Sequence, residues 1–275
     1  MKTATILPQK FMHLAKDDDY HMALAHLIGK EGFEQYTEFF KAVGEDPNKF
    51  LMLDTGLIEG DPRPIEELLE KAKMLGADEM ALPDVFMDHQ ATLRESHDAM
   101  EYIQNHYAYY GNNDKSKHPN LMAIPQGTCH EGWVACAKEM LTWPVQTIGI
   151  PKVLYKLEGM RGRLDALIAI QDVLGDKEVH LLGCWETPLE LKLIENATRA
   201  GYIRPVRGVD SAIAYAYAKE GLRITDAERP QDPINFGAQE VDMDVLKYNI
   251  KVWEEEAATL PPIDDIKNQK IRRLY

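Results

Sequence analysis

The chain is poor in cysteine and has no long apolar run. Its three cysteines, Cys129, Cys136 and Cys184, include no Cys-x-x-Cys pair, so the sequence predicts buried free thiols rather than a disulfide framework or a thiolate zinc site. No apolar run approaches the ~20 residues that cross a bilayer, and no basic and apolar leader opens the chain. We therefore expect no membrane partner and a cytoplasmic location.

Basic residues are also in deficit, because 31 Lys and Arg stand against 45 Asp and Glu and give a formal net charge of -14. This balance excludes a protein that coats nucleic acid through its overall charge, although local basic clusters can still bind phosphates. The sequence contains no internal repeat and no low-complexity tract. With 275 residues and 45% hydrophobic content, it suits one complete β/α barrel better than two ordinary domains.

Six short apolar runs indicate the fold, because each stops at a polar residue or a glycine turn and a helical stretch follows. The runs are 50–53, 80–83, 121–125, 147–148, 179–182 and 203–209, and the residues at their ends are Asp54, Asp84, Gln126, Gly149, Gly183 and Asp210. This rhythm is typical of a parallel barrel, in which the residues at the C-terminal strand ends point into the active site. The sequence therefore predicts an α/β fold, a (β/α)8 barrel of TIM type.

The remaining elements follow from apolar spacing and turn residues. A first strand is expected at 3–7, and the segment 20–28 reads as either a strand or a short helix. Helices are expected at 33–43, 65–75, 92–107, 131–141, 164–174, 189–200, 211–219 and 241–253. We expect one barrel domain over residues 1–222 and a C-terminal extension with one helix over residues 223–275.

The strand ends present Asp54, Asp84 and Asp210 with Gln126 between them, and three interpretations compete for this set. Two carboxylates flanking a glycosidic bond could carry out glycosyl transfer, one as nucleophile and the other as proton carrier. The carboxylates could instead bind a divalent metal together with His89 or His180. They could also have only a structural role, as caps of the helices that follow.

The same strand ends resemble, in order, the guanine transglycosylases known from queuosine and archaeosine insertion into tRNA. The matching segments are Leu53-Asp54-Thr55-Gly56, Leu82-Pro83-Asp84, Pro125-Gln126-Gly127, Ile148-Gly149-Ile150, Leu181-Leu182-Gly183 with Glu186-Thr187-Pro188, and Arg207-Gly208-Val209-Asp210. They correspond to a DSGG-type strand end, a base-reading Asp, a VQGG turn, a VGGL turn, an LMGVGxP segment and a late nucleophilic Asp. The resemblance covers roughly residues 45–220.

The resemblance implies a role for each of these positions. Asp210 would be the nucleophile that attacks C1′ of the sugar, and Asp54 would handle protons beside it. The base would be bound by Asp84, Gln126, Gly127, Gly149 and Gly183. From its place after the Gly183 strand end, Trp185 is a further candidate for shaping the base pocket. The leaving and entering bases share one pocket, so the reaction needs no metal and no cofactor.

The departures from the family pattern favour DNA as the substrate. The zinc subdomain of the tRNA enzymes, Cys-x-Cys-x-x-Cys with a His, and their long basic C-terminal part have no match here. Leu57 and Thr128 replace the second glycines of two motifs, and Ser211 replaces the Cys after the nucleophile. A short, acidic, zinc-free chain is most similar to the subset, found largely in phages, that exchanges guanine in DNA for a 7-deazaguanine base. Exchange in tRNA is the alternative.

The polymer is expected to contact basic residues near the strand ends. The predicted phosphate contacts are Lys152, Arg161, Arg163, Arg204 and Arg207, and further basic residues lie in the tail at Lys267, Lys270, Arg272 and Arg273. Two other classes of protein stay open from the sequence. One is a metal-dependent hydrolase or lyase with an Asp-rich barrel, and the other is a catalytically inactive nucleic-acid-binding relative.

Overall fold

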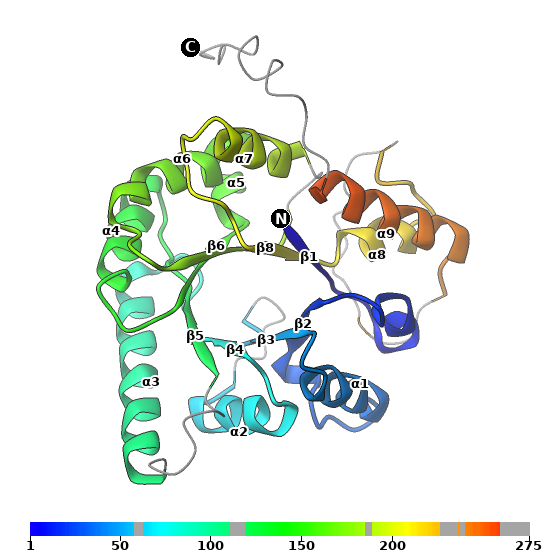
Figure 1. Ribbon diagram of the computed structural model, residues 1–275, viewed down its shortest axis with the longest axis horizontal. Helices are drawn as coiled ribbons and strands as arrows, with labels where there is room; N and C mark the ends of the chain where they lie inside the picture. Colours follow the sequence, from blue (N-terminus) through cyan, green and yellow to red (C-terminus); the bar gives the residue numbers. More distant parts are fainter. Residues whose placement is uncertain (58–62, 111–118, 185–188, 226–235, 237–239, 259–275) are drawn as a thin grey trace.

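The computed structural model describes residues 1–57, 63–110, 119–184, 189–225, 236 and 240–258. They form eight parallel strands in a nearly closed barrel with helices outside it, which confirms the predicted fold (Figure 1). The strands are β1 (Lys2–Thr5), β2 (Tyr20–Leu24), β3 (Phe50–Asp54), β4 (Glu79–Ala81), β5 (Asn120–Ala123), β6 (Thr147–Pro151), β7 (Glu178–Leu182) and β8 (Gly208–Ser211). The sheet runs in the order β1-β8-β7-β6-β5-β4-β3-β2, and its edge strands β1 and β2 lie close together.

The strands alternate with an outer layer of helices. The α-helices are α1 (Glu34–Glu45), α2 (Ile65–Leu75), α3 (His89–Tyr110), α4 (His130–Met140), α5 (Val153–Glu158), α6 (Gly162–Ile170), α7 (Leu189–Arg199), α8 (Ile213–Lys219) and α9 (Met243–Ala258). Short 3-10 helices are η1 (Gln9–Ala15), η2 (Ala25–Leu27), η4 (Gly159–Arg161) and η5 (Gln171–Val173). Helix α5 was not predicted, and the ambiguous segment 20–28 contains both a strand and a short helix.

Strand β8 is shorter than its apolar run predicts. The run starts at Ile203, whereas the strand begins at Gly208. Pro205 has no N–H to give to a sheet, and Ile203 and Val206 are buried as loop residues instead. As a result, the residues before Gly208 lie at the N-terminal end of the barrel, away from Asp210.

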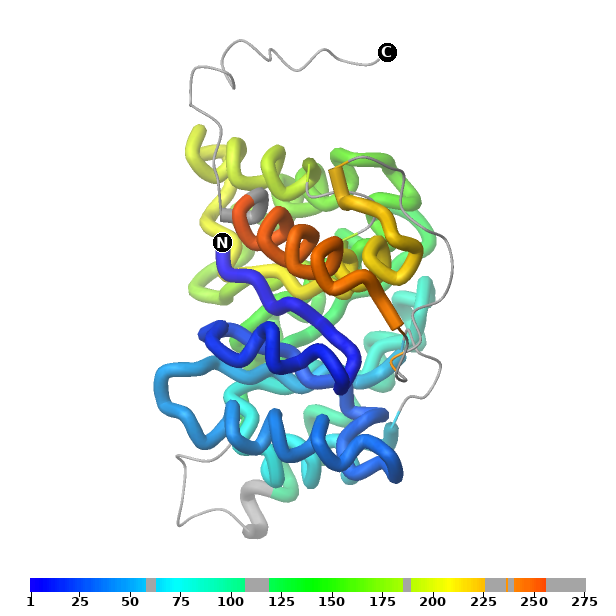
Figure 2. Tube along the Cα trace, turned by 90° about the vertical axis from the view of Figure 1, so that its right-hand side faces the viewer, coloured from blue at the N-terminus to red at the C-terminus, as the bar shows by residue number. Residues whose placement is uncertain are grey.

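Helix α9 belongs to the outer layer of the barrel. It packs against α8, α7 and β1, and Leu246, Ile250 and Trp253 on it are buried. Figures 1 and 2 both show α9 beside the N-terminal strand. Strand β1 is followed by the 3-10 helix η1 rather than by an α-helix, so α9 covers apolar surface that would otherwise face water.

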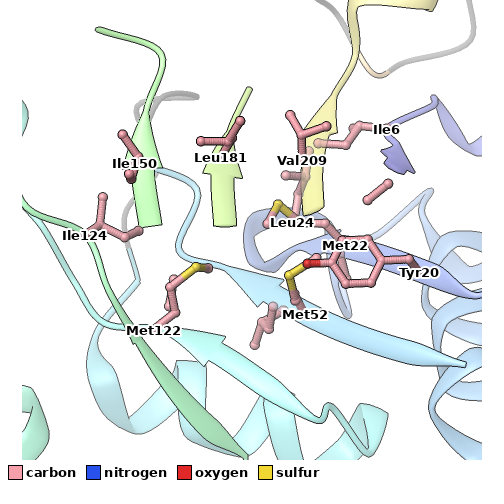
Figure 3. Packing of buried hydrophobic residues seen from close by; sticks show 14 of the residues in the cluster. Ile6, Tyr20, Met22, Leu24, Met52, Met122, Ile124, Ile150, Leu181 and Val209 are labelled. Atoms are coloured by element: carbon pink, nitrogen blue, oxygen red, sulfur yellow. The ribbon is translucent and has the colours of Figure 1, made fainter. Parts of the chain in front are cut away.

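The barrel interior is filled by long side chains at middle depth. Met22, Met52 and Met122 are buried there beside Tyr20, whereas Leu181 and Val209 point to the outer side of their strands (Figure 3). Because side chains alternate along a strand, His180 and Asp210 face the interior. The inward side of Gly149 is closed, since a Cβ there would lie 2.9 Å from Leu182 Cδ1 and 3.1 Å from Met122 Sδ.

An ion-pair network lies at the N-terminal end of the barrel. Arg207 Nη2 is 2.5 Å from Oε1 of Glu79, and Nη1 is 2.7 Å from Oε2 of Glu178. Thr147 Oγ1 also donates to Glu79, over 2.5 Å, and the guanidinium carbon of Arg207 lies 4.8 Å from the centre of the Phe50 ring. The carboxylate of Glu79 is fully buried, so it depends on these partners.

Candidate functional site

The carboxylate of Asp210 is held by two groups through a single oxygen. Oδ1 lies 3.0 Å from Nε2 of His180 and accepts a hydrogen bond of 3.2 Å from the backbone N–H of Gly183. The other oxygen, Oδ2, accepts no hydrogen bond from the part of the chain that the structure describes. The side chain is 8% exposed, and that of His180 is fully buried. This carboxylate therefore has a fixed orientation, and one of its oxygens is uncommitted among the described residues.

Asp210 does not cap the helix that follows it. Helix α8 begins at Ile213, whose N–H is bonded to Oγ of Ser211, and Ala212 occupies the N-cap position. The purely structural interpretation of this strand-end Asp therefore has no support in the geometry.

The turn after β7 is built to present the N–H of Gly183. Gly183 has a φ of +69°, which favours glycine, and a Cβ there would lie 2.8 Å from Cδ of Lys152. Its carbonyl oxygen accepts a 2.8 Å hydrogen bond from Nη1 of Arg163, and Arg163 is also ion-paired with Glu190 of α7. In this structure Gly183 holds Asp210, while the predicted contact with the base stays a prediction.

Asp84 and Gln126 form a second, directly bonded pair. Each lies three residues beyond the end of its strand, β4 or β5, and Nε2 of Gln126 donates to Oδ2 of Asp84 over 2.6 Å. Oε1 of Gln126 accepts from the N–H of Met87 at 3.3 Å, which fixes the orientation of the amide. Burial raises the pKa of Asp84 to about 7, although the bond from Gln126 lowers it. The pair is thus a buried polar site whose charge changes near neutral pH.

The loop after Asp84 is tightly tied and exposes an aromatic ring. Thr92 Oγ1 accepts from the N–H of Val85 and donates to its carbonyl oxygen, and Ser96 Oγ donates to the carbonyl of Pro83. Met87 has a φ of 57°, which is uncommon for a residue other than glycine. Phe86 is 48% exposed on this loop. The sequence analysis missed it, although its position two residues after a strand-end Asp was a usable signal.

Asp54 lies at the end of β3 and faces the barrel interior. It is two residues beyond Met52, whose sulfur lies 3.6 Å from Nη2 of Arg207 inside the barrel. Oδ2 of Asp54 accepts from the N–H of Gly56 over 3.1 Å. The carboxylate therefore stabilises its own turn and stays at the C-terminal end of the barrel, as does Asp210.

Two of the predicted base contacts are close-packed glycines. Gly149 lies within β6, which continues to Pro151, and side chains cover its inward face. The strand therefore ends two residues later than predicted, and the contact of the Gly149 backbone with a base stays a prediction. At Gly127, a Cβ would lie 2.4 Å from the backbone nitrogen of Trp133, so the β5 turn packs directly on α4.

The predicted phosphate contacts separate into two groups. Lys152 and Arg161 lie beyond β6, on the side of the strand ends, and Arg161 is bonded to Asp165 over 2.7 Å. Arg204 and Arg207 precede β8 and therefore lie at the opposite end of the barrel. Arg163 has no exposed surface. We therefore remove Arg163, Arg204 and Arg207 from the predicted nucleic-acid surface. Arg163 is buried in its ion pair with Glu190, Arg204 lies at the opposite end of the barrel, and Arg207 belongs to the network with Glu79.

Several predictions concern residues outside the described part of the chain. Trp185, the segment 186–188 and the basic residues of the tail belong to this group. The expected burial of all three thiols is wrong for Cys129, which is exposed, whereas Cys136 and Cys184 are buried.

The main contact that the sequence analysis missed is between His180 and Asp210. His180 was considered only as a metal ligand, although its inward position on β7, three residues before Gly183, was a signal.

Among the described residues no group of three or more His, Cys, Asp or Glu side chains is placed to hold a metal ion. Within the same residues, no helix is both long and apolar enough to span a membrane. No family model matches the chain.

Proposed function

We propose that the protein is a guanine transglycosylase that exchanges guanine in DNA for a 7-deazaguanine base. The observation that carries the proposal is the state of Asp210: Oδ1 is held by His180 and Gly183, and Oδ2 accepts no hydrogen bond from any residue that the structure describes. A nucleophilic carboxylate needs this arrangement, because one oxygen must keep the group in place while the other forms a bond.

The reaction has two similar halves. Oδ2 of Asp210 forms a bond to C1′ while the bond between C1′ and N9 of guanine breaks, and the electron pair leaves with the base, which takes up a proton. The entering base then loses its N9 proton, attacks C1′ and releases the carboxylate. Asp54, at the same end of the barrel, is the proposed carrier of the proton in both halves.

The pair of Asp84 and Gln126 supports a pocket for a guanine-like edge. A carboxylate accepts hydrogen bonds from N1–H and from the exocyclic amine, and a base without these donors would leave the buried charge with fewer hydrogen bonds. Phe86 offers a half-exposed ring on the same loop for stacking against a base that has left the helix.

The preference for DNA follows the resemblance to the zinc-free subset of the family. The proposed phosphate contacts beyond β6 are Lys152 and Arg161. We add Lys156, which is exposed on helix α5 between them. This surface is small, so the protein should bind DNA weakly and prefer sites where the target guanine is already unpaired.

Mass spectrometry of nucleosides tests the proposal in cells that express the chain together with a deazaguanine pathway. We expect a 7-deazaguanine nucleoside in DNA, and none in cells that carry the Asp210→Asn variant. The modified base in tRNA alone would replace DNA by tRNA as substrate. Its absence from both polymers, with the protein folded and present, would contradict the proposed function.

A further inference from the structure

A continuous chain of hydrogen-bond contacts runs from the network at the N-terminal end of the barrel to Asp210. Nε of Arg207 donates to the hydroxyl of Tyr20 over 3.0 Å. That hydroxyl lies 2.8 Å from Nδ1 of His180, and Nε2 of the same ring lies 3.0 Å from Oδ1 of Asp210. Tyr20 and His180 are both buried, so water does not replace these contacts.

The chemistry of Arg207 gives this chain a direction. A guanidinium only donates hydrogen bonds, so the hydroxyl of Tyr20 must accept from it and has its own proton left to donate. Among the described residues, the acceptor in contact with the hydroxyl is Nδ1 of His180, which must then accept that proton. In a neutral imidazole the proton is therefore on Nε2, from which it is donated to Oδ1 of Asp210.

We propose that Arg207, acting through Tyr20, fixes the tautomer of His180, and that His180 is thereby a positioning residue for Asp210. The tautomer follows from the contacts alone, whereas its consequence for catalysis rests on the proposed function. With the proton on Nδ1 instead, a lone pair of Nε2 would face the carboxylate. Asp210 would then lose one of the two groups that hold Oδ1.

The titratable and charged groups around this chain of contacts come from several strands. His180 contacts Asp210 on β8 and Tyr20 on β2. Glu178 lies on the same strand as His180 and is paired with Arg207. Beyond Tyr20 lies Arg207, and its nitrogens Nη1 and Nη2 both donate to the carboxylate of Glu79. Lys2 Nζ lies 5.9 Å from the centre of the Tyr20 ring and is paired with Asp19. Burial raises the pKa of Tyr20, against the opposing effect of Arg207, so the hydroxyl keeps its proton at neutral pH.

Long-range 1H–15N correlation spectra of the 15N-labelled full chain test the tautomer directly. We expect His180 to carry its proton on Nε2 in the wild type, and the Tyr20→Phe variant to gain a population protonated on Nδ1. His180→Gln identifies the signal by removing it. His21, whose Nε2 lies 2.8 Å from the carbonyl oxygen of Asp18, is an internal reference for a ring that must donate through Nε2.

Tyr36→Phe is the matched control, because the Tyr36 hydroxyl is also buried and accepts a 3.0 Å hydrogen bond from the N–H of Leu24. This control should leave the His180 signal unchanged. A wild-type His180 protonated on Nδ1, or an unchanged tautomer in folded Tyr20→Phe, would overturn the inference whether or not the protein exchanges bases.

Exchange kinetics test the positioning role. Tyr20→Phe should lower kcat about ten- to hundredfold and leave KM for the free base unchanged.

Two variants of His180 separate positioning from packing. His180→Gln keeps an amide donor near the place of Nε2 and should retain more exchange than His180→Leu, which has no donor. Equal losses in the two variants, or an unchanged kcat in folded Tyr20→Phe, would overturn the positioning role. Absence of exchange in the wild type, with the predicted tautomer present, would instead contradict the proposed function and leave the tautomer assignment standing.

Discussion

Gln126 donates its amide hydrogen to Oδ2 of Asp84 over 2.6 Å, in a place where burial raises the pKa of the carboxyl to about 7. The two side chains come from neighbouring strand ends and are both almost fully buried. Burial of an ionised carboxyl group lowers the free energy of unfolding, so its presence at the barrel mouth indicates a ligand that binds the charged group.

Base affinity should depend on the ionisation of Asp84. The carboxylate accepts two hydrogen bonds from a guanine edge, whereas the protonated group has lost part of this capacity. The dissociation constant of guanine should therefore increase up to about tenfold per pH unit as pH falls below 7, and level off above that value. Calorimetry between pH 5.5 and 8.5 measures this, with Asp84→Asn as the pH-independent control. A flat profile for the wild type would exclude Asp84 from base reading.

Asp84 should also lower the stability of the fold at high pH. Its pKa is higher in the folded chain than the ordinary 3.8, so the folded state binds the extra proton between about pH 4 and 7. Stability is then lost as pH rises through this window. Asp84→Asn should increase the free energy of unfolding at pH 8 by a few kcal/mol and have little effect at pH 4. Urea unfolding at pH 4 and at pH 8 measures this change. An equal effect of Asp84→Asn at the two pH values would show that the buried charge of Asp84 does not cause the loss of stability.

The salt dependence of DNA binding should identify the face that the polymer approaches. Charge reversal of Lys156 and Arg161 together should reduce the slope of log K against log salt by about 1.5, because each lost phosphate contact removes roughly 0.7 to 0.9. Arg204→Glu is the control, since Arg204 is exposed at the opposite end of the barrel. Equal effects of the two changes would mean that the DNA does not approach over the β6 side.

Arg163 should matter for folding. Its guanidinium pairs with Glu190, which is 1% exposed, and binds the carbonyl of Gly183. Arg163→Met should lower the free energy of unfolding by about 3–5 kcal/mol, because it leaves a buried charge without a partner. The double variant Arg163→Met/Glu190→Leu should recover much of this loss in urea unfolding. Full stability of the single variant would contradict the assigned role of the pair.

The sequence predicts the barrel well because its signal is local. Each strand appears as an apolar run, and each strand end as a polar residue or glycine, so Asp54, Asp84 and Asp210 could be placed at one end of the barrel from chain order alone. The run from Ile203 led to a wrong start for β8, because buried loop residues and buried strand residues are of the same apolar types. The two cases differ here only through Pro205 and the register of β8 with β1.

The contacts that orient the site were beyond reach from the sequence. Tyr20 and His180 are 160 residues apart and meet only because the barrel brings β2 near β7. Arg163 and Arg207 were predicted to contact phosphates, because most arginines are exposed. Their carboxylate partners, Glu190 and Glu79, lie on other elements, and no local pattern indicates those pairs.

Exchange of labelled guanine tests the central claim most directly. Purified protein is incubated in chelator with unlabelled DNA and labelled free guanine, and label retained in the DNA is counted. If Asp210 forms a covalent bond to C1′, free guanine must be able to enter by the reverse of its departure. We predict incorporation into DNA by the wild type, little into tRNA, and none with Asp210→Asn or Asp210→Ala. Incorporation by Asp210→Asn at more than a few percent of the wild-type rate would contradict the account.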